Sequence, residues 1–204
     1  MISPDPDTPS PQPAMRFDIR PVTLQLWPQL EALFGKKGAC NGCWCMYWRI
    51  GPAYHRRPRD ENRLALKGIV EAGPPPGLLA FDGGVAVGWC QVTPRTEIPW
   101  IDASRNLRRV DEAPVWSISC FYVRNKHRRR GVTKALVDAA VAYAAECGAA
   151  IVEAYPVDKA QPKGASNAFT GIASSFAKAG FTEVARRSPS RPIMRRVLGQ
   201  DDRR

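Results

Sequence analysis

The stretch between residues 115 and 155 constrains the fold of this chain more than any other part. A run rich in β-branched and aromatic residues at 115–123 leads into a short basic loop, and a second such run follows at 149–155. Between them, apolar residues recur at helical spacing from residue 132 to residue 147. A helix between two strands packs its apolar face on the sheet that the strands form. The pattern therefore predicts a sheet covered by helices.

The remaining segments add further strands and helices. Periodicity predicts three more helices, over residues 24–34, 60–72 and 168–179. β-rich runs predict five more strands, over residues 15–21, 78–81, 85–92, 181–185 and 193–197. Thr23 is expected to cap the first helix, and Asp82-Gly83-Gly84 is typical of a hairpin turn. The predicted class is α/β, with a mixed, mostly antiparallel central sheet and helices on both faces.

Length and composition indicate one domain with two tails. The chain has 204 residues, of which 44% are hydrophobic, which is enough for one sizeable core. We expect a proline-rich, disordered tail at 1–13, a single domain at 14–198 and a C-terminal tail at 199–204. No apolar run approaches the length of about 18 residues that a membrane span needs. The N-terminus lacks the apolar region of a secretory signal, so we expect a cytoplasmic protein with six reduced cysteines.

The loop before the central helix has the composition of an anion site. It contains Arg128, Arg129 and Arg130, followed by Gly131, and the whole chain carries a net charge of +11. Free N–H groups and the positive dipole end at a helix start attract anions. Glycine allows a close backbone approach, and arginines add charge. We therefore expect a phosphate or pyrophosphate ligand, although a solvated basic turn would have the same composition. The spacing matches neither a Walker loop nor a dinucleotide-binding fingerprint.

The segment Arg128-Arg129-Arg130-Gly131-Val132-Thr133 resembles the [Q/R]-x-x-G-x-[G/A] signature of the GNAT superfamily of acyl-CoA N-acyltransferases. Thr133 departs from the small residue usual at the last position. Ser174-Ser175-Phe176-Ala177-Lys178-Ala179-Gly180-Phe181 is similar to the helix-to-strand segment of the family. The order of elements extends the resemblance over residues 14–198, and its specific part covers residues 120–181.

The resemblance implies an acetyl-CoA-dependent acetyltransferase that needs no metal. It implies that main-chain N–H groups cradle the pyrophosphate, contributed by Arg129, Arg130, Gly131, Val132, Thr133 and Lys134. Arg128 and Arg130 would supply charge. Phe121 and Val123 would bind the pantetheine arm through their main chain, and their strand and the next would splay to admit the thioester.

The acid and base of the reaction are less constrained. Phe176 stands where many relatives have a tyrosine that protonates the leaving thiolate, so Tyr155, Ser174 and Ser175 are substitute candidates, and water is another. A thiol of pKa about 8.5 also leaves without much help near neutral pH. A carboxylate within reach of the amine can take its proton. We place Glu97 first, because it directly follows the hairpin. The other acidic candidates are Asp102, Asp111, Glu112 and Glu153.

The segment at 38–48 is rich in cysteine and aromatic residues. Aromatic side chains commonly line small-molecule sites, so we expect Trp44 and Tyr47, with Trp116, to bind the acceptor, although core packing explains such residues equally well. Cys40, Cys43 and Cys45 could bind zinc with His55. Paired ligand doublets are absent, so buried thiols are the preferred interpretation and no metal is expected.

The net charge also limits which classes of amine can be the acceptor. A strongly basic protein repels polycations, so a neutral or acidic primary amine, or a lysine of a protein, fits better than a polyamine. Two alternatives stay open: a nucleic-acid-associated protein, for example one acting on aminoacyl-tRNA, and a non-catalytic sensor of CoA. We expect no membrane partner, and a monomer or a homodimer.

Overall fold

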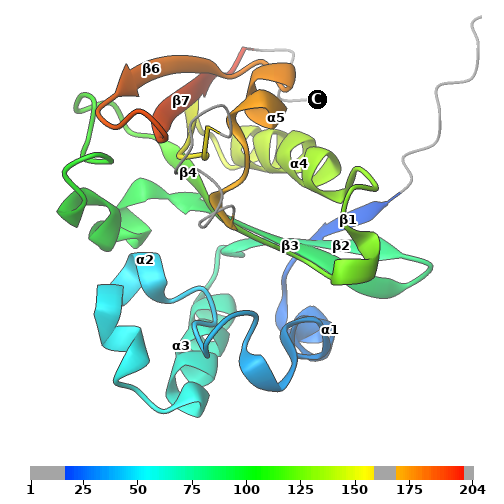
Figure 1. Ribbon diagram of the computed structural model, residues 1–204. Helices are drawn as coiled ribbons and strands as arrows, with labels where there is room; N and C mark the ends of the chain where they lie inside the picture. The colour runs from blue at the N-terminus through cyan, green and yellow to red at the C-terminus, as the bar shows by residue number, and fades with distance from the viewer. Residues whose placement is uncertain (1–16, 159–168, 200–204) are drawn as a thin grey trace, which may run out of the picture.

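The computed structural model describes residues 17–158 and 169–199, which form a seven-stranded sheet between two layers of helices (Figure 1). The strand order is β1-β2-β3-β4-β5-β7-β6. All neighbours are antiparallel except β4 and β5, which are parallel. The strands are β1 (Asp18–Pro21), β2 (Gly77–Asp82), β3 (Val85–Pro94), β4 (Trp116–Val123), β5 (Ile151–Ala154), β6 (Thr182–Arg186) and β7 (Pro192–Val197).

The helices divide between the two faces of the sheet. In Figure 1, α1, α2 and α3 lie below the sheet, and α4 and α5 lie above it. The α-helices are α1 (Trp27–Phe34), α2 (Tyr47–Ile50), α3 (Arg59–Ala72), α4 (Val132–Glu146) and α5 (Ala173–Lys178). The 3₁₀-helices are η1 (Leu24–Leu26), η2 (Gly35–Lys37), η3 (Gly51–His55), η4 (Arg95–Glu97), η5 (Pro99–Ala103) and η6 (Asn125–His127).

Each face of the sheet has its own apolar core. On one face, Ile118 and Phe121 of β4 pack with α4 residues such as Leu136 and with Phe176 of α5. On the other, Trp89 of β3 packs with residues of α1 and α3. A third cluster, which includes Trp48, Ile98, Leu107 and Tyr155, joins α2 to the segment after β3 and to β7. The predicted fold class, with helices on both faces of a mostly antiparallel sheet, is therefore confirmed.

The first helix differs from its prediction. Thr23 is extended and makes no side-chain cap, and the chain passes through η1 before α1 begins at Trp27. Pro28 explains the shift, because proline lacks the N–H that a helix interior needs and fits only in the first turn. The predicted tail at 1–13 and residues 200–204 of the predicted tail at 199–204 lie outside the described residues, as do residues 14–16 and 159–168 of the predicted domain. No helix in the described part of the chain has the length and apolar character that crossing a membrane requires.

Candidate active site

The centre of the sheet opens where β4 and β5 stop pairing. β4 continues to Val123, but its ladder with β5 ends at the pair Ile118 and Ala154. On the other side, the register with β3 shifts, so that Ser119 has no partner between the pairs Gln91–Cys120 and Val92–Ile118. An unpaired residue of this kind bends a strand and increases its twist. Among the described strands, β4 therefore has only β3 as a neighbour beyond Ile118, and its other backbone edge pairs with none of them.

The open edge of β4 carries the backbone of Phe121 and Val123. Arg124 donates its N–H to Val87 O at 3.0 Å, so it belongs to a hydrogen-bonded position of the β3–β4 ladder. Such positions alternate in an antiparallel pair, which directs the N–H and C=O groups of Phe121 and Val123 away from β3. Arg128 Nε confirms this direction, because it donates to Val123 O at 3.2 Å. Both predicted pantetheine-binding residues thus present main-chain polar groups to the open side.

The basic loop and the start of α4 follow directly on this edge. Gly131 caps α4 with φ +90°, a left-handed conformation that glycine adopts without steric cost, and a Cβ there would meet only open space. The first helical hydrogen bond runs from Ala135 N–H to Gly131 O at 3.1 Å. The N–H groups of Val132, Thr133 and Lys134 precede it and have no acceptor within the helix.

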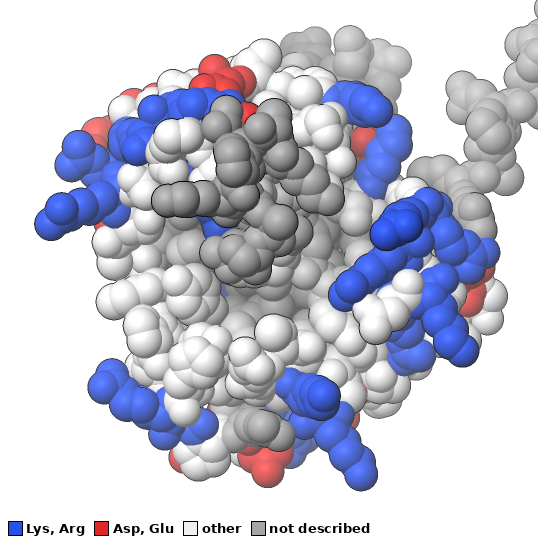
Figure 2. Space-filling model, in the orientation of Figure 1, with Lys and Arg blue, Asp and Glu red and all other residues white. Residues whose placement is uncertain are grey.

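Positive charge surrounds this helix start. Figure 2 shows lysine and arginine side chains gathered on the right of the view, where Figure 1 places the loop before α4. Arg128 and Arg129 are exposed, and Arg129 has φ +61°. Arg130 lies 3.9 Å from Asp82, with its side chain 42% exposed. Free N–H groups, a helix dipole and arginines with room in front of them fit a pyrophosphate.

Several buried polar atoms beside the strand opening lack partners. Ser119 Oγ and both side-chain polar atoms of Gln91 make no hydrogen bond within the described residues, and neither residue is exposed. An unsatisfied buried polar atom costs about 1–3 kcal/mol, so it usually marks a site for water or a ligand. The end of the sheet opening therefore offers polar atoms to a bound group.

Glu97 lies in η4, directly after β3, as its position in the sequence predicts. Its side chain is 56% exposed and lies 3.2 Å from Arg49 NH1, which also donates to the Glu97 carbonyl at 2.8 Å. Arg49 is itself nearly buried, and burial lowers its pKa. The carboxylate of Glu97 is thus held in place from one side and accessible from the other.

Tyr155 is buried in a polar network, whereas a general acid must reach the leaving group. It is fully buried, and its hydroxyl contacts Glu153 Oε1 at 2.7 Å, Ser117 Oγ at 2.8 Å and Arg95 NH1 at 2.8 Å. Burial and the neighbouring Glu153 carboxylate raise the pKa of Tyr155 well above its ordinary value. Within the described residues, the hydroxyl of Tyr155 and the carboxylate of Glu97 have different hydrogen-bond partners and do not bind each other.

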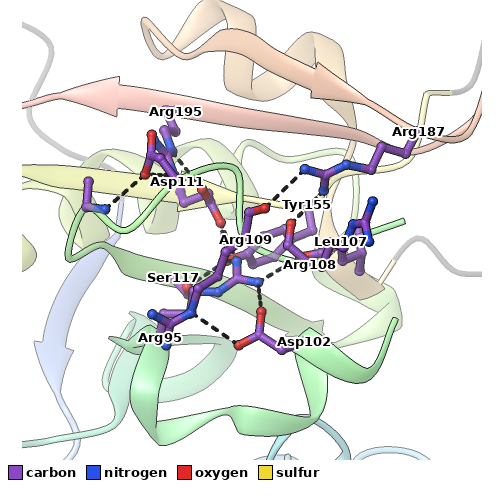
Figure 3. A network of polar contacts seen from close by, with 12 residues as sticks. Arg95, Asp102, Leu107, Arg108, Arg109, Asp111, Ser117, Tyr155, Arg187 and Arg195 are labelled. Carbon is purple, nitrogen blue, oxygen red and sulfur yellow. Dashed lines mark hydrogen bonds and ion pairs between the residues drawn. The ribbon is translucent and has the colours of Figure 1, made fainter. Parts of the chain in front are cut away.

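The contacts of Tyr155 belong to a larger buried network (Figure 3). Glu153 is fully buried and accepts hydrogen bonds from Arg95 at 2.5 Å and from Arg195 Nε at 2.6 Å. Arg95 also binds Asp102 and donates to Leu107 O at 2.7 Å, and Arg195 binds both oxygens of Asp111. These charges tie β5 and β7 to the segment after β3. No sequence pattern indicates this network, because its acidic members resemble solvated surface residues.

The network also limits which carboxylates can accept a proton. Arg195 holds the pKa of Asp111 below its ordinary value, Asp102 is bound by Arg95, and Glu153 lies between two arginines. Glu112 is 92% exposed at the side chain and lies 3.5 Å from Arg109. Glu97 and Asp111 are both about half exposed, at 56% and 49%. Arg195 engages both oxygens of Asp111, whereas Arg49 contacts one side-chain oxygen of Glu97.

The three predicted acceptor-binding aromatics occupy three different places. Trp44 is 5% exposed and packs in the core against Trp27 and Phe34. Trp116 packs on Tyr143 of α4, on the opposite face of the sheet. Tyr47 lines a cavity, with Trp48 beside it. The structure therefore does not gather the three residues into one pocket.

The three cysteines of the 38–48 segment differ in exposure: Cys45 is buried, Cys43 is half-buried and Cys40 is exposed, so the expectation of buried thiols is wrong for Cys40. Cys45 is buried 3.7 Å from Cys120 and accepts a hydrogen bond from Trp89 Nε1, while burial raises the pKa of Cys43 to about 12. Within residues 17–158 and 169–199, no three potential metal ligands form a group. Phe176 is fully buried, with its ring 5.1 Å from that of Phe181.

Comparison with known proteins gives one match at the level of sequence family. The model of a family described as acetyltransferase (GNAT) matches residues 42–163. No curated protein matches the sequence.

Solved structures extend the similarity of fold to most of the chain. PaiA N-acetyltransferase from Thermoplasma acidophilum, in complex with coenzyme A, is 13% identical with a TM-score of 0.53, covering 90% of this chain and 100% of its own. YncA, a putative acetyltransferase from Salmonella typhimurium with acetyl-CoA, is 15% identical with a TM-score of 0.54, covering 91% and 96%. A protein from Corynebacterium glutamicum, titled histone acetyltransferase HPA2 and related acetyltransferase, is 16% identical with a TM-score of 0.56, covering 91% and 98%.

Proposed function

This chain belongs to the GNAT family of acetyltransferases, and on that premise we propose that it transfers an acetyl group from acetyl-CoA to a primary amine by direct attack in a ternary complex. The observation that carries the proposal is the open edge of β4, which leads into the basic loop and the free N–H groups of α4. The acceptor is a small molecule or a protein amine. We further propose a cytoplasmic location, consistent with six free cysteines in the structure, and a monomer or a homodimer.

We propose that the cofactor is held along this edge. The N–H groups from Arg129 to Lys134 bind the pyrophosphate, Arg128 and Arg130 supply charge, and the main chain of Phe121 and Val123 binds the pantetheine arm. Acetyl-CoA supplies an activated acetyl group: attack by the free-base amine nitrogen forms a C–N bond and breaks the C–S bond, releasing the N-acetyl product, the CoA thiolate and one proton. No metal is required for this step.

Glu97 is our proposed general base, acting directly or through one water. An amine attacks as the free base, and deprotonating a lysine-like amine at pH 7 costs about 4–5 kcal/mol. A carboxylate that is exposed on one side and fixed by Arg49 on the other is suited to take that proton. Tyr155 is one of the candidate acids, with Ser174, Ser175 and water, but the three contacts of its hydroxyl favour a positioning role instead. We propose that CoA leaves as the thiolate, since Phe176 has no proton to give.

The first test is calorimetric titration of the purified protein with acetyl-CoA, in parallel with tRNA and duplex DNA. We expect saturable, micromolar binding of acetyl-CoA and release of free thiol when a suitable amine is added. Binding of nucleic acid alone, with affinity falling as salt rises, would contradict the proposal and favour a nucleic-acid-associated protein. Binding of acetyl-CoA without thiol release for any amine would favour a sensor.

A further inference from the structure

A cavity of about 250 Å³ lies between α2 and the segment that contains η5. Three aromatic rings and three polar side chains contribute to its wall: Tyr47, Trp48, Trp100, Ser104, Asn106 and Arg191. An aromatic wall with a few convergent polar groups is typical of a site for a small organic molecule. The buried network fixes one side of it, since Arg95 binds the Leu107 carbonyl and Asp102 on that segment.

The cavity is attached to both of the diverging strands. Trp48 donates its indole N–H at 3.0 Å to the carbonyl of Ser119, the residue of β4 where pairing with β5 has just ended. Arg191 donates at 3.1 Å to the carbonyl of Tyr155, the residue that follows β5. The two walls of the cavity are thus tethered on either side of the sheet opening. A molecule in the cavity would lie next to an acetyl group delivered through that opening.

Arg191 gives the cavity a positive charge that nothing in its wall neutralises. Its NH1 donates to Tyr155 O and to Thr170 Oγ1 at 2.9 Å, and it forms no ion pair with a carboxylate of the described residues. Burial lowers its pKa, as expected for a cation that has lost part of its hydration. The nearby acids are engaged elsewhere, Glu97 with Arg49 and Asp102 with Arg95. A partly desolvated guanidinium in such a wall favours an anionic ligand.

We propose that Arg191 binds a carboxylate of the acceptor, and that the acceptor is a small primary amine of the amino-acid class with an apolar or aromatic body. This inference rests on the proposed N-acetyltransferase function. A polyamine would bring further positive charge to a wall that has no acidic residue. A lysine side chain would bring no carboxylate for Arg191 to bind. In the reaction the amine nitrogen bonds to the acetyl carbon, the C–S bond breaks with its electrons going to sulfur, and the amine proton passes to Glu97 or water.

The test compares amines that differ only in the carboxylate. L-phenylalanine and L-phenylalaninamide form the first matched pair, and the other apolar and aromatic amino acids with their carboxamides form the panel. Acetylation is followed by release of free thiol. The amide has the less basic amine and therefore more free base at neutral pH, so intrinsic reactivity would favour the amide. We expect the enzyme to reverse this order, with kcat/KM at least about tenfold higher for the best acid than for its amide.

Variants of Arg191 then assign the preference to one side chain. Arg191→Gln is expected to raise the KM for the acid about 10- to 100-fold more than the KM for the amide. The charge-assisted hydrogen bond is lost only with the acid, whereas the lost contact with Tyr155 O affects both substrates alike. Arg191→Lys should retain part of the preference, because it keeps the charge but not the planar fork. Arg105→Gln is the matched control: Arg105 is exposed in the same segment, does not line the cavity and loses the same charge.

The outcomes separate the two proposals. A wild-type protein that fails to bind acetyl-CoA overturns the proposed function. A protein that binds acetyl-CoA but acetylates every amide, or a protein lysine, as well as the acids overturns the assignment of the cavity alone. Failure to acetylate any acid while acetyl-CoA binds does the same. If Arg191→Gln loses acetyl-CoA binding, it has misfolded, and the comparison of Arg191→Lys with Arg105→Gln decides.

Discussion

The two ends of the proposed active site are built in different ways. The loop before α4 is one continuous stretch of sequence that binds through main-chain N–H groups at a helix start. The cavity beside α2 comes from segments far apart in the sequence and is held by buried side chains such as Arg95 and Glu153. A backbone site recognises what many acyl donors share. A side-chain site can differ from one protein to the next, which makes it the place where the acceptor is selected.

The largest expected effect is on acetyl-CoA binding at the main-chain site before α4. Gly131→Asp should abolish detectable acetyl-CoA binding in calorimetry, because it sets a carboxylate where the pyrophosphate would lie. The free protein should keep its fold but lose some stability, because a side chain at φ +90° strains the backbone while an acidic residue at a helix N-terminus interacts well with the dipole.

Gly148 provides the matched control at the other end of α4. It also has positive φ, +83°, and a Cβ there would meet nothing within 4 Å. Gly148→Asp should lower stability, through the backbone strain and the unfavourable helix terminus, but leave acetyl-CoA affinity unchanged. Equal loss of affinity in both variants would contradict the assignment of the cofactor loop.

The next largest effect is on stability and tests the buried network beside the acceptor cavity. Glu153→Gln leaves Arg95 and Arg195 without the buried charge that they share, which is expected to lower the free energy of unfolding by about 3–5 kcal/mol. Urea unfolding followed by circular dichroism measures it. Glu112→Gln, on a side chain that is 92% exposed, should change little. Similar stability of the two variants would mean that the network is not a major contributor.

A smaller effect tests the tether between the cavity and β4. Trp48→Phe keeps an aromatic ring but removes the N–H that binds Ser119 O, so the KM of the acceptor should rise about three- to tenfold with acetyl-CoA affinity unchanged. Trp27 is the control, because its buried indole N–H has no hydrogen-bond partner within the described residues. Trp27→Phe should leave the acceptor KM unaltered. A higher acceptor KM in both variants would point to a general loss of packing.

The smallest expected effect is on the stability of the fold at acidic pH. Arg195 lowers the pKa of Asp111 in the folded state, so this pair stabilises the fold above the ordinary carboxyl pKa of 3.8 and loses that contribution as pH falls through the lower folded value. Below pH 3.8, the melting temperature of Asp111→Asn should therefore fall less steeply with decreasing pH than that of the wild type. Thermal melts at a series of acidic pH values compare the two slopes. Parallel slopes would exclude a contribution from this pair.

Much of the fold could be predicted because its signals are local. Residues 132–146 carry helical periodicity and β4 a β-rich run, so both elements lie within a few residues of their predicted ends. The loop from Arg128 to Lys134 could be found for the same reason, since helix start, glycine and arginines are consecutive. Thr23 does not cap the helix because Pro28 occupies the first turn of α1, which begins at Trp27, three residues beyond the expected start at Leu24.

The sequence by itself determined the order of the strands and of every α-helix in the described residues except α2, the glycine at the start of α4 and the charge around it. Only the tertiary structure decided which charges are buried and which aromatics meet. Glu153 and Arg95 are 58 positions apart, and Arg191 lies in a C-terminal region whose many arginines suggest a solvated surface. Periodicity reports which face of an element is apolar. It carries no information on partners between distant elements, because burial and hydrogen bonding arise only when the chain has packed.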